Sequence, residues 1–591
     1  MFGKSIGAGL ITLLAIGAAC AAEAQPEPID YAKVRLQSFV KIPLRDGVRL
    51  SGDLYFPDSG VAPRACVLTM TPYISQTYHE RGVYFAAHGY VFAAVDVRGR
   101  GDSEGEFRPL IQEANDGYDT VEWLARQPYC NGKVGMWGGS YAGYNQWAAA
   151  KEKPPHLLTI VPAAAPYAGA DFPMLNNIPS TYLIQWLSFT QGHTSKDQLF
   201  ADFNWWLAQN RRWLESGASF ESLDGLLGAP SPSFHEWLQH PAVDEYWDRY
   251  NPTARQYAEL HLPILTITAS HDDDQPGALA HYRQHMKNAS DAERARHYLI
   301  IGPWDHAGTR TPKAEVGGLK FGPASLVDLP KLHLDWYAWT MLGGDKPEFL
   351  KDKVAYYVMF ADRWRYAASL DAVTAEARPL LLDSRGGAND LYGSGAMLAS
   401  AAGGSPDHYV YDPRDVSGAA LEQQVDPTSY VDQRLLNGRN GKQLVYHSAP
   451  FTQDTEVSGF FKLSAWIAID QPDTDFTAGV YEVRDDGGSI LLTSQVLRAR
   501  YRESLRESKP VSTKAPLRYD FNQFTFASQE IKRGSRLRLV IGPINSIYME
   551  KNYNTGGVTS KETVKDARTV TVTLFHDRAH PSTLYVPMGR P

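Results

Sequence analysis

The stretch from residue 134 to residue 144 constrains the fold of this chain more than any other. It reads Val-Gly-Met-Trp-Gly-Gly-Ser-Tyr-Ala-Gly-Tyr and predicts a buried strand, a tight turn that carries Ser140, and a helix over residues 144–151. Small residues must flank the serine because the turn brings the strand and helix backbones close together. Such a turn holds the hydroxyl clear of the sheet, and the first helical turn aims its amides at negative charge developing there. Residues 138–143 are therefore interpreted as a nucleophile elbow, although Gly-x-Ser-x-x-Gly also occurs at ordinary strand-to-helix turns.

Strand and helix patterns alternate over the first half of the chain. Asp46-Gly47 predicts a hairpin between two alternating apolar runs, and the remaining strands are short buried apolar runs. The expected strands cover residues 34–42, 48–56, 65–70, 91–95, 133–137, 159–162, 262–269 and 296–301, and the expected helices cover 84–88, 115–127, 144–151, 278–287 and 329–342. This alternation implies a largely parallel sheet covered on both faces.

Two other regions depart from this alternation. Residues 170–249 are helical, rich in tryptophan and broken by Pro and Gly, which predicts a helical cap inserted over the sheet. From about residue 352 the chain becomes short strands with regular turns, and residues 455–469 and 517–526 each read as one strand. The predicted fold class is therefore α/β. An α/β-hydrolase domain with its inserted cap spans residues 25–370, and an all-β jelly roll spans residues 371–591.

The N-terminus has the pattern of a targeting segment. Lys4 precedes an apolar run over residues 6–18, and Ala22-Glu23-Ala24 forms a cleavage site before Gln25. Residues 1–24 are therefore predicted to be a signal peptide that directs export to a periplasm or to the outside. The apolar run is too short to predict a membrane span. Lipoprotein anchoring at Cys20 is the alternative, and the glycine at position 17, where such signals prefer leucine, argues against it.

Composition narrows the choice of partners. The formal net charge is −8 with both signs interspersed, so nothing indicates a nucleic-acid partner. After cleavage only Cys66 and Cys130 remain, which does not make a disulfide scaffold, and whether the two pair is left open. Neither their spacing nor their neighbours suggest metal ligation. A homo-oligomer stays an open alternative.

Three polar residues follow predicted strands in the order that acyl-transfer enzymes of this architecture use. Ser140, Asp272 and His306 each come after a buried strand, which matches nucleophile, then acid, then base. The acid has rivals in Asp273, Asp274 and Asp305, and the base has rivals in His271 and His88. Asp272 is preferred because it lies nearest its strand end, and His306 because no rival follows a strand after the acid.

An oxyanion hole needs two hydrogen-bond donors aimed at the developing alkoxide. The backbone N–H of Tyr141, directly after the serine, is one expected donor. The second should come from the loop after an earlier strand, where the phenol of Tyr73 is the candidate. The alternative is that Tyr73 is an ordinary core aromatic residue.

With these residues in place, the sequence resembles the X-Pro dipeptidyl-peptidase-like serine hydrolases, a group that includes cocaine-esterase-like hydrolases and α-amino-acid ester hydrolases. The resemblance covers nearly the whole mature chain. It rests on the motifs at residues 42–47, 71–73, 96–105, 138–143, 302–306, 473–476 and 552–557. It implies that Ser140 is the nucleophile, that the Tyr73 hydroxyl serves the oxyanion hole, and that a helical cap and a C-terminal jelly roll are present.

One segment departs from the family pattern. The family usually has Gly-Trp-Tyr-Asp around its acid, whereas residues 269–272 read Ala-Ser-His-Asp, so the pocket wall there should differ. The resemblance to α-amino-acid ester hydrolases also implies acidic residues that bind a substrate ammonium. Asp273 and Asp274 match this in part, and the sequence does not identify the further acidic partner from the cap.

The sequence therefore predicts an exported serine hydrolase that acts on a small ester, amide or short peptide through a covalent acyl-enzyme. Neither a metal nor a cofactor is expected. An X-Pro dipeptidyl-peptidase or aminopeptidase is the alternative within the same chemistry. A hypothesis from another class is an inactive homologue that acts as a binding protein through its jelly roll.

Overall fold

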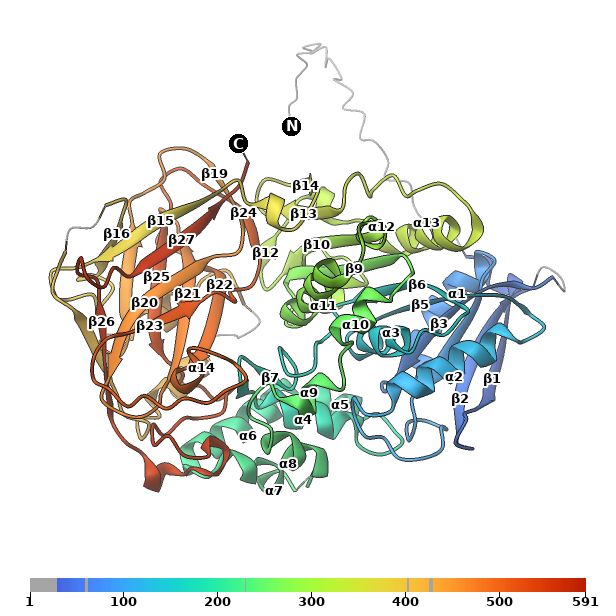
Figure 1. Ribbon diagram of the computed structural model, residues 1–591, viewed down its shortest axis with the longest axis horizontal. Coiled ribbons are helices and arrows are strands. Elements are labelled where there is room, and N and C mark those ends of the chain that lie inside the picture. The colour runs from blue at the N-terminus through green and yellow to red at the C-terminus, as the bar shows by residue number, and fades with distance from the viewer. Residues whose placement is uncertain are drawn as a thin grey trace, which may run out of the picture.

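The computed structural model describes residues 29–58, 62–228, 230–400, 403–424, 429–439 and 441–590. The predicted signal peptide, residues 1–24, lies outside this part. Figure 1 shows an α/β part, a β-rich part beside it, and a layer of helices below that reaches from one to the other. Within the described residues, no helix is long and apolar enough to cross a bilayer.

The first sheet has ten strands within the described residues, in the order β1-β2-β4-β3-β5-β6-β9-β10-β13-β14. The strands from β4 to β13 in this order are parallel, whereas hairpins form both edges. In sheet order they are β1 (Val34–Pro43), β2 (Arg49–Pro57), β4 (Val91–Asp96), β3 (Arg64–Thr71), β5 (Cys130–Gly139), β6 (Leu157–Ala163), β9 (Ile264–His271), β10 (His297–Asp305), β13 (Val354–Val358) and β14 (Arg363–Ala367). Because the carboxyl ends of the parallel strands share one edge, residues that follow β5, β9 and β10 gather there.

Helices cover both faces of this sheet, as the buried side chains of β5 show. Met136 joins the core beneath α2 (Glu113–Ala125) and α3 (Tyr141–Lys151). Its neighbour Trp137 points the other way, into the core beneath α1 (His79–Ala87) and α13 (Leu329–Leu342). A further helix, α11 (Gln275–Asn288), follows β9. The strand is apolar on both faces because both are buried.

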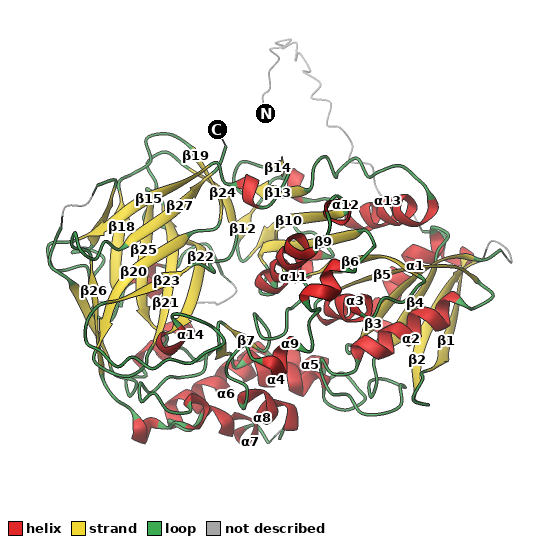
Figure 2. Ribbon diagram, in the orientation of Figure 1, coloured by secondary structure: helices red, strands yellow, loops and turns green. Residues whose placement is uncertain are grey.

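The segment between β6 and β9 carries the helical layer seen in Figure 2. Its helices are α4 (Tyr182–Thr190), α5 (Asp197–Ala201), α6 (Phe203–Ser216), α7 (Leu223–Leu226), α8 (Pro232–Leu238), α9 (Glu245–Asp248) and α10 (Ala254–Ala258). Trp186, Trp213 and Trp237 pack in one apolar cluster with Tyr141 and Tyr144 of α3. The tryptophans of this segment therefore anchor the cap directly over the helix that follows Ser140.

The second large sheet folds into the β-rich part of the molecule (Figure 1). Its strands are β15 (Glu376–Asp383), β16 (Gly395–Leu398), β17 (Asp407–Tyr411), β18 (Leu444–Ser448), β19 (Thr455–Gly459), β20 (Lys462–Ile469), β21 (Asp475–Val483), β22 (Ser489–Arg498), β23 (Leu517–Phe521), β24 (Ala527–Ile531), β25 (Arg536–Pro543), β26 (Val570–Phe575) and β27 (Thr583–Met588). Two short helices, α14 (Ser417–Gln424) and α15 (Arg434–Asn437), lie in this part.

Two strand predictions in this region were wrong. Residues 455–469 form two strands, β19 and β20, that separate after Gly459. Gly459 has a φ of +131°, and an added Cβ would lie 2.0 Å from Thr374 Oγ1, so no other residue fits this corner. Residues 517–526 likewise divide between β23 and β24. The strands β13 and β14 are short and follow one another closely, as the strands of the β-rich part do. They nevertheless pair with the first sheet.

Cys66 of β3 and Cys130 at the start of β5 form a disulfide, with their Cα atoms 6.0 Å apart. The two strands are neighbours in the first sheet. The sequence left this pairing open because separation along the chain says nothing about neighbouring strands.

Candidate active site

Ser140 occupies a strained backbone position between β5 and α3. Its φ is +61° and its ψ is −132°, a conformation that costs a residue other than glycine about 1–3 kcal/mol. The flanking glycines are required by close approach. An added Cβ at Gly138 would lie 2.8 Å from the Ala142 Cβ, and one at Gly143 would lie 2.7 Å from the Ala163 carbonyl oxygen. The sharp turn predicted from the sequence is therefore present, and packing on both sides holds the serine in it.

Asp272 and His306 meet at the carboxyl edge of the sheet. The Nδ1 of His306 lies 2.8 Å from Oδ1 of Asp272, whose other oxygen accepts a 2.8 Å hydrogen bond from Thr268. The Asp272 side chain has no exposed surface, whereas the His306 side chain is 33% exposed. Burial lowers the pKa of His306, but the hydrogen bond and charge of Asp272, together with the charge of Asp274, outweigh it, and the pKa is raised.

The rivals for these two positions lie elsewhere or make weaker contacts. Asp274 Oδ2 is 3.8 Å from His306 Nδ1, and Asp305 accepts the Gly308 amide. His271 stacks on Tyr430 at 4.8 Å between ring centres, and burial lowers its pKa to about 4. His88 contacts the Tyr84 carbonyl at the end of α1. Geometry therefore pairs His306 with Asp272.

Tyr73 faces Ser140 across the turn. Its phenol oxygen lies 3.1 Å from Ser140 Oγ and accepts a 3.3 Å hydrogen bond from the indole Nε1 of Trp186. The Tyr73 ring stacks on Phe189 of α4. Burial raises the pKa of Tyr73 to about 12, so the phenol keeps its proton at neutral pH and can donate a hydrogen bond. The alternative that Tyr73 is only a core aromatic residue does not account for its contact with Ser140.

Tyr141 is fixed by its own side chain. Its hydroxyl donates a 2.5 Å hydrogen bond to Glu113 Oε1 and accepts the Leu110 amide at 2.6 Å. Its ring stacks on Trp186 at 5.5 Å between ring centres. Burial raises the pKa of Glu113 to about 7. These contacts hold the first residue of α3, and with it the backbone amide next to Ser140.

Acidic side chains gather beside His306. Asp274 is 18% exposed, and burial together with the nearby charges of Asp171, Asp272 and Asp273 raises its pKa well above its ordinary value. Asp171 precedes the cap helices and accepts the backbone amides of Tyr167 at 2.9 Å and Gly277 at 2.6 Å. Burial raises the pKa of Asp171 to about 8. Asp273 is exposed.

Sequence reasoning missed four residues around this site. In the sequence Trp186 is one of many tryptophans of the cap, and no spacing points to Glu113, Asp171 or Tyr430. The His271 ring fills the place where the family pattern has aromatic residues, and it stacks on Tyr430 from the β-rich part. A residue far along the chain therefore packs against the residue before Asp272, and the expected difference in the pocket wall stays a prediction. No cluster of His, Cys, Asp and Glu able to hold a metal occurs among the described residues.

Comparisons with known proteins identify the family. The family model of the X-Pro dipeptidyl-peptidase, S15 family, matches residues 46–308, and that of the X-Pro dipeptidyl-peptidase C-terminal non-catalytic domain matches residues 349–585. The chain belongs to the X-Pro dipeptidyl-peptidase-like family. It is 29% identical over 578 residues to cocaine esterase from Rhodococcus sp. (strain MB1 Bresler), which covers 93% of this chain and 98% of the relative.

Two solved structures share the fold across almost the whole chain. An α-amino acid ester hydrolase superposes with a TM-score of 0.80 at 20% identity, covering 97% of this chain and 100% of the other. An aminopeptidase from a marine sediment Thaumarchaeota archaeon gives a TM-score of 0.81 at 19% identity, covering 97% and 99%. The chain is therefore an α/β hydrolase with a C-terminal β-rich domain, and it is a serine hydrolase of the esterase or X-Pro peptidase type.

Proposed function

We propose that this chain cleaves ester or amide bonds through a covalent acyl-enzyme on Ser140, with His306 and Asp272 completing the catalytic triad. One observation carries the proposal. A serine held in a strained turn lies 3.1 Å from the phenol of a partly buried tyrosine, at the sheet edge where a histidine is hydrogen-bonded to a buried carboxylate. This combination of nucleophile, donor and oriented base fits acyl transfer.

In the first half of the reaction, Ser140 Oγ attacks the acyl carbon while His306 takes the hydroxyl proton. The negative charge then moves to the acyl oxygen, where the Tyr73 phenol and the Tyr141 backbone N–H donate hydrogen bonds. His306 passes its proton to the leaving alcohol or amine, the bond to that group breaks, and the acyl group remains on Ser140.

Water completes the cycle. It attacks the acyl carbon as His306 removes one of its protons, and the carboxylic acid leaves when the same proton returns to Ser140 Oγ. Asp272 holds Nδ1–H of His306 toward itself, so that Nε2 is the nitrogen that exchanges protons.

A test of this chemistry uses a fluorophosphonate probe, which bonds covalently to an activated serine. We expect one label per chain, located on the peptide that contains Ser140. The variant Ser140→Ala should take up none, whereas Ser103→Ala, which changes a buried serine outside the site, should label normally if it folds. Equal labelling of the Ser140 variant contradicts the proposal.

The substrate class follows from the acidic side chains beside His306. Asp274 and Asp273 place two carboxyl groups on this side of the site, and an acyl group that carries an ammonium would stabilise their ionised forms, which burial disfavours. We therefore propose aminoacyl esters or amides as preferred substrates. An X-Pro dipeptidyl-peptidase is the second candidate, because the free N-terminus of a peptide would use the same carboxylates. Comparing aminoacyl p-nitrophenyl esters, simple acyl esters and an X-Pro-nitroanilide separates these outcomes.

We further propose that the protein is exported and that its mature form begins at Gln25. The pattern of residues 1–24 supports this proposal. The N-terminal sequence of protein recovered from the periplasm or medium of a bacterial host tests it. A chain that keeps residues 1–24 and stays inside the cell contradicts it, and a lipid on Cys20 indicates anchoring instead.

A further inference from the structure

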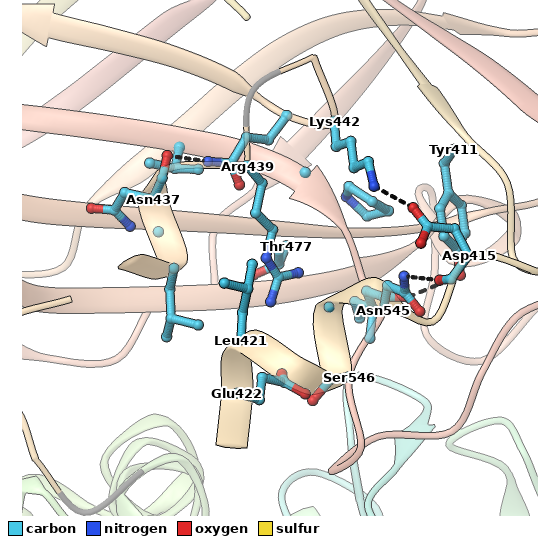
Figure 3. A pocket seen from close by; sticks show the side chains of 18 of the residues that line it. Tyr411, Asp415, Leu421, Glu422, Asn437, Arg439, Lys442, Thr477, Asn545 and Ser546 are labelled. Atoms are coloured by element: carbon cyan, nitrogen blue, oxygen red, sulfur yellow. Dashed lines mark hydrogen bonds and ion pairs between the residues drawn. The ribbon is translucent and has the colours of Figure 1, made fainter. Parts of the chain in front are cut away.

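The β-rich domain contains a pocket of about 460 Å³ that the proposed chemistry does not use. It lies between the strands β17, β21, β22 and β25, the helices α14 and α15, and the segment that follows β25 (Figure 3). Its volume falls within the range of about 300–1,000 Å³ that is usual for small-molecule sites. None of the residues of the candidate active site lines it.

Some of the charged side chains that line this pocket already have partners of opposite charge. Lys442 pairs with Asp415 and also donates to Ser417 Oγ at 3.1 Å. Asp412 accepts a 2.9 Å hydrogen bond from Arg414. Both of these carboxylates therefore have cationic partners already.

Arg439 differs from these pairs. Figure 3 shows its side chain extending into the pocket toward Leu421. Its Nε is buried and has no hydrogen-bond partner among the described residues. An added Cβ at Gly418 would lie 3.5 Å from Nη1, so the guanidinium packs over a glycine that leaves it room. Glu422 also lines the pocket; its carboxylate accepts the Ile547 amide at 3.0 Å, and burial raises its pKa even though the charge of Arg439 acts to lower it.

Asn545 lines the same pocket and carries a second buried polar atom without a partner. Asn545 donates a 2.6 Å hydrogen bond from Nδ2 to the Asp415 carbonyl, which fixes the orientation of its amide. The Oδ1 of Asn545 is then left buried and without a partner among the residues described. Buried polar groups that lack partners are uncommon in native proteins, because they lose their hydration and gain no hydrogen bond in return.

Six apolar side chains also line the pocket, namely Val410, Leu421, Leu436, Val496, Val540 and Met549. A guanidinium has donors only, in a planar fork that matches a carboxylate. We propose that this pocket binds a small organic carboxylate, with its charge on Arg439, its apolar body against these side chains, and a hydroxyl or N–H donor to Asn545 Oδ1. The proposal is independent of the active-site assignments.

Titration of the full mature chain with 6-hydroxy-2-naphthoate tests this site, because the probe combines a carboxylate, an apolar body and a hydroxyl. The Ser140→Ala background is used throughout, so that turnover plays no part. We expect saturable binding that weakens at least about tenfold in Arg439→Met, since that variant removes a charge-assisted pair. The matched control is Arg434→Met, which removes an exposed arginine paired with Asp432 outside the pocket and should bind normally.

Two further comparisons keep the test decisive. The neutral 6-hydroxy-2-naphthamide should bind at least about tenfold more weakly than the acid, and Arg439→Lys should fall between the native chain and Arg439→Met. If Arg439→Met does not fold, the lysine variant and a crystal structure of the complex take its place. Equal binding of acid and amide, unchanged binding in the Arg439 variants, or a complex with the carboxylate away from Arg439 overturns the proposal.

Discussion

The indole nitrogen of Trp186 donates a hydrogen bond to the phenol oxygen of Tyr73 over 3.3 Å. Trp186 belongs to the cap helix α4, whereas Tyr73 follows a strand of the sheet and lies 3.1 Å from Ser140 Oγ. Because the phenol oxygen accepts from Trp186, its own proton is free to point toward Ser140 and the developing oxyanion. A cap residue therefore contacts the phenol that we propose as the donor to the oxyanion.

This relationship predicts the effect of Trp186→Phe. The variant keeps an aromatic ring next to Tyr141 but removes the donated hydrogen bond, which is worth about 0.5–1.5 kcal/mol. We expect kcat to fall about three- to tenfold with little change in KM, because the lost contact acts on the donor for the transition state. Steady-state kinetics on an activated ester measures both constants.

Two other variants serve as comparisons for Trp186→Phe. Tyr73→Phe removes the donor itself and should lower kcat by about 10²–10³. Trp205→Phe changes a cap tryptophan that contacts Trp206 and should leave kcat unchanged. A Trp186→Phe enzyme whose KM rises while kcat stays constant would show that Trp186 only shapes the substrate pocket.

The His306–Asp272 hydrogen bond predicts how activity depends on pH. His306 acts as a base only when it is neutral, and its pKa is raised above the ordinary value of 6.5. The value of kcat/KM should therefore be low in acid, rise as pH increases through a midpoint above 6.5, and reach a plateau in mildly alkaline solution. A pH profile of kcat/KM with a substrate that does not titrate in this range gives the midpoint.

Replacing the carboxylate tests the cause of that shift. In Asp272→Asn the negative charge is lost, so the midpoint should move to lower pH. The amide also favours the wrong tautomer of His306, which should lower kcat by about 10⁴. Asp305→Asn changes a carboxylate that caps the Gly308 amide, and it should keep the native midpoint. An unchanged midpoint in Asp272→Asn argues against the assigned pair.

Asp274 should determine whether the enzyme distinguishes charged from neutral acyl groups. Its carboxylate lies 3.8 Å from His306 Nδ1 and is only partly exposed. In Asp274→Asn we expect KM to rise about tenfold for aminoacyl esters and to stay nearly constant for the same esters with an acetylated amine. The ratio of kcat/KM for each free and acetylated pair is the measurement, and an equal loss for both substrates contradicts an ammonium site.

Much of this arrangement could be predicted from the sequence because its cause is local. Ser140, Asp272 and His306 each follow a buried parallel strand, and such strands end at one edge of the sheet, so the strand pattern places all three at that edge. The contacts of Trp186, Glu113 and Tyr430 could not be predicted, because each depends on how a distant segment docks. The strand break at Gly459 was missed for the same reason: its conformation is required by the approach of Thr374, far along the chain.

Three buried histidines predict the acid sensitivity of the fold. His285 and His297 contact each other through their Nδ1 atoms at 3.0 Å, and His281 lies between the Tyr257 hydroxyl at 2.7 Å and the Pro166 carbonyl at 3.1 Å. Burial lowers the pKa of His281 to about 3 and that of His285 to about 4. The unfolded chain therefore binds more protons than the folded one between about pH 4 and 6.5.

The contribution of these histidines to the free energy of unfolding should therefore not change with pH above about pH 6.5. Below that value it should fall as the pH decreases. Each histidine contributes up to about 1.4 kcal/mol per pH unit over the range in which only its unfolded form is protonated. His285→Gln removes one titrating group and should flatten this slope, whereas His261→Gln, at an exposed position, should leave it unchanged. Denaturant unfolding at several pH values measures the slope. A His285→Gln slope equal to that of the native chain would mean that protonation of other groups causes the loss of stability in acid.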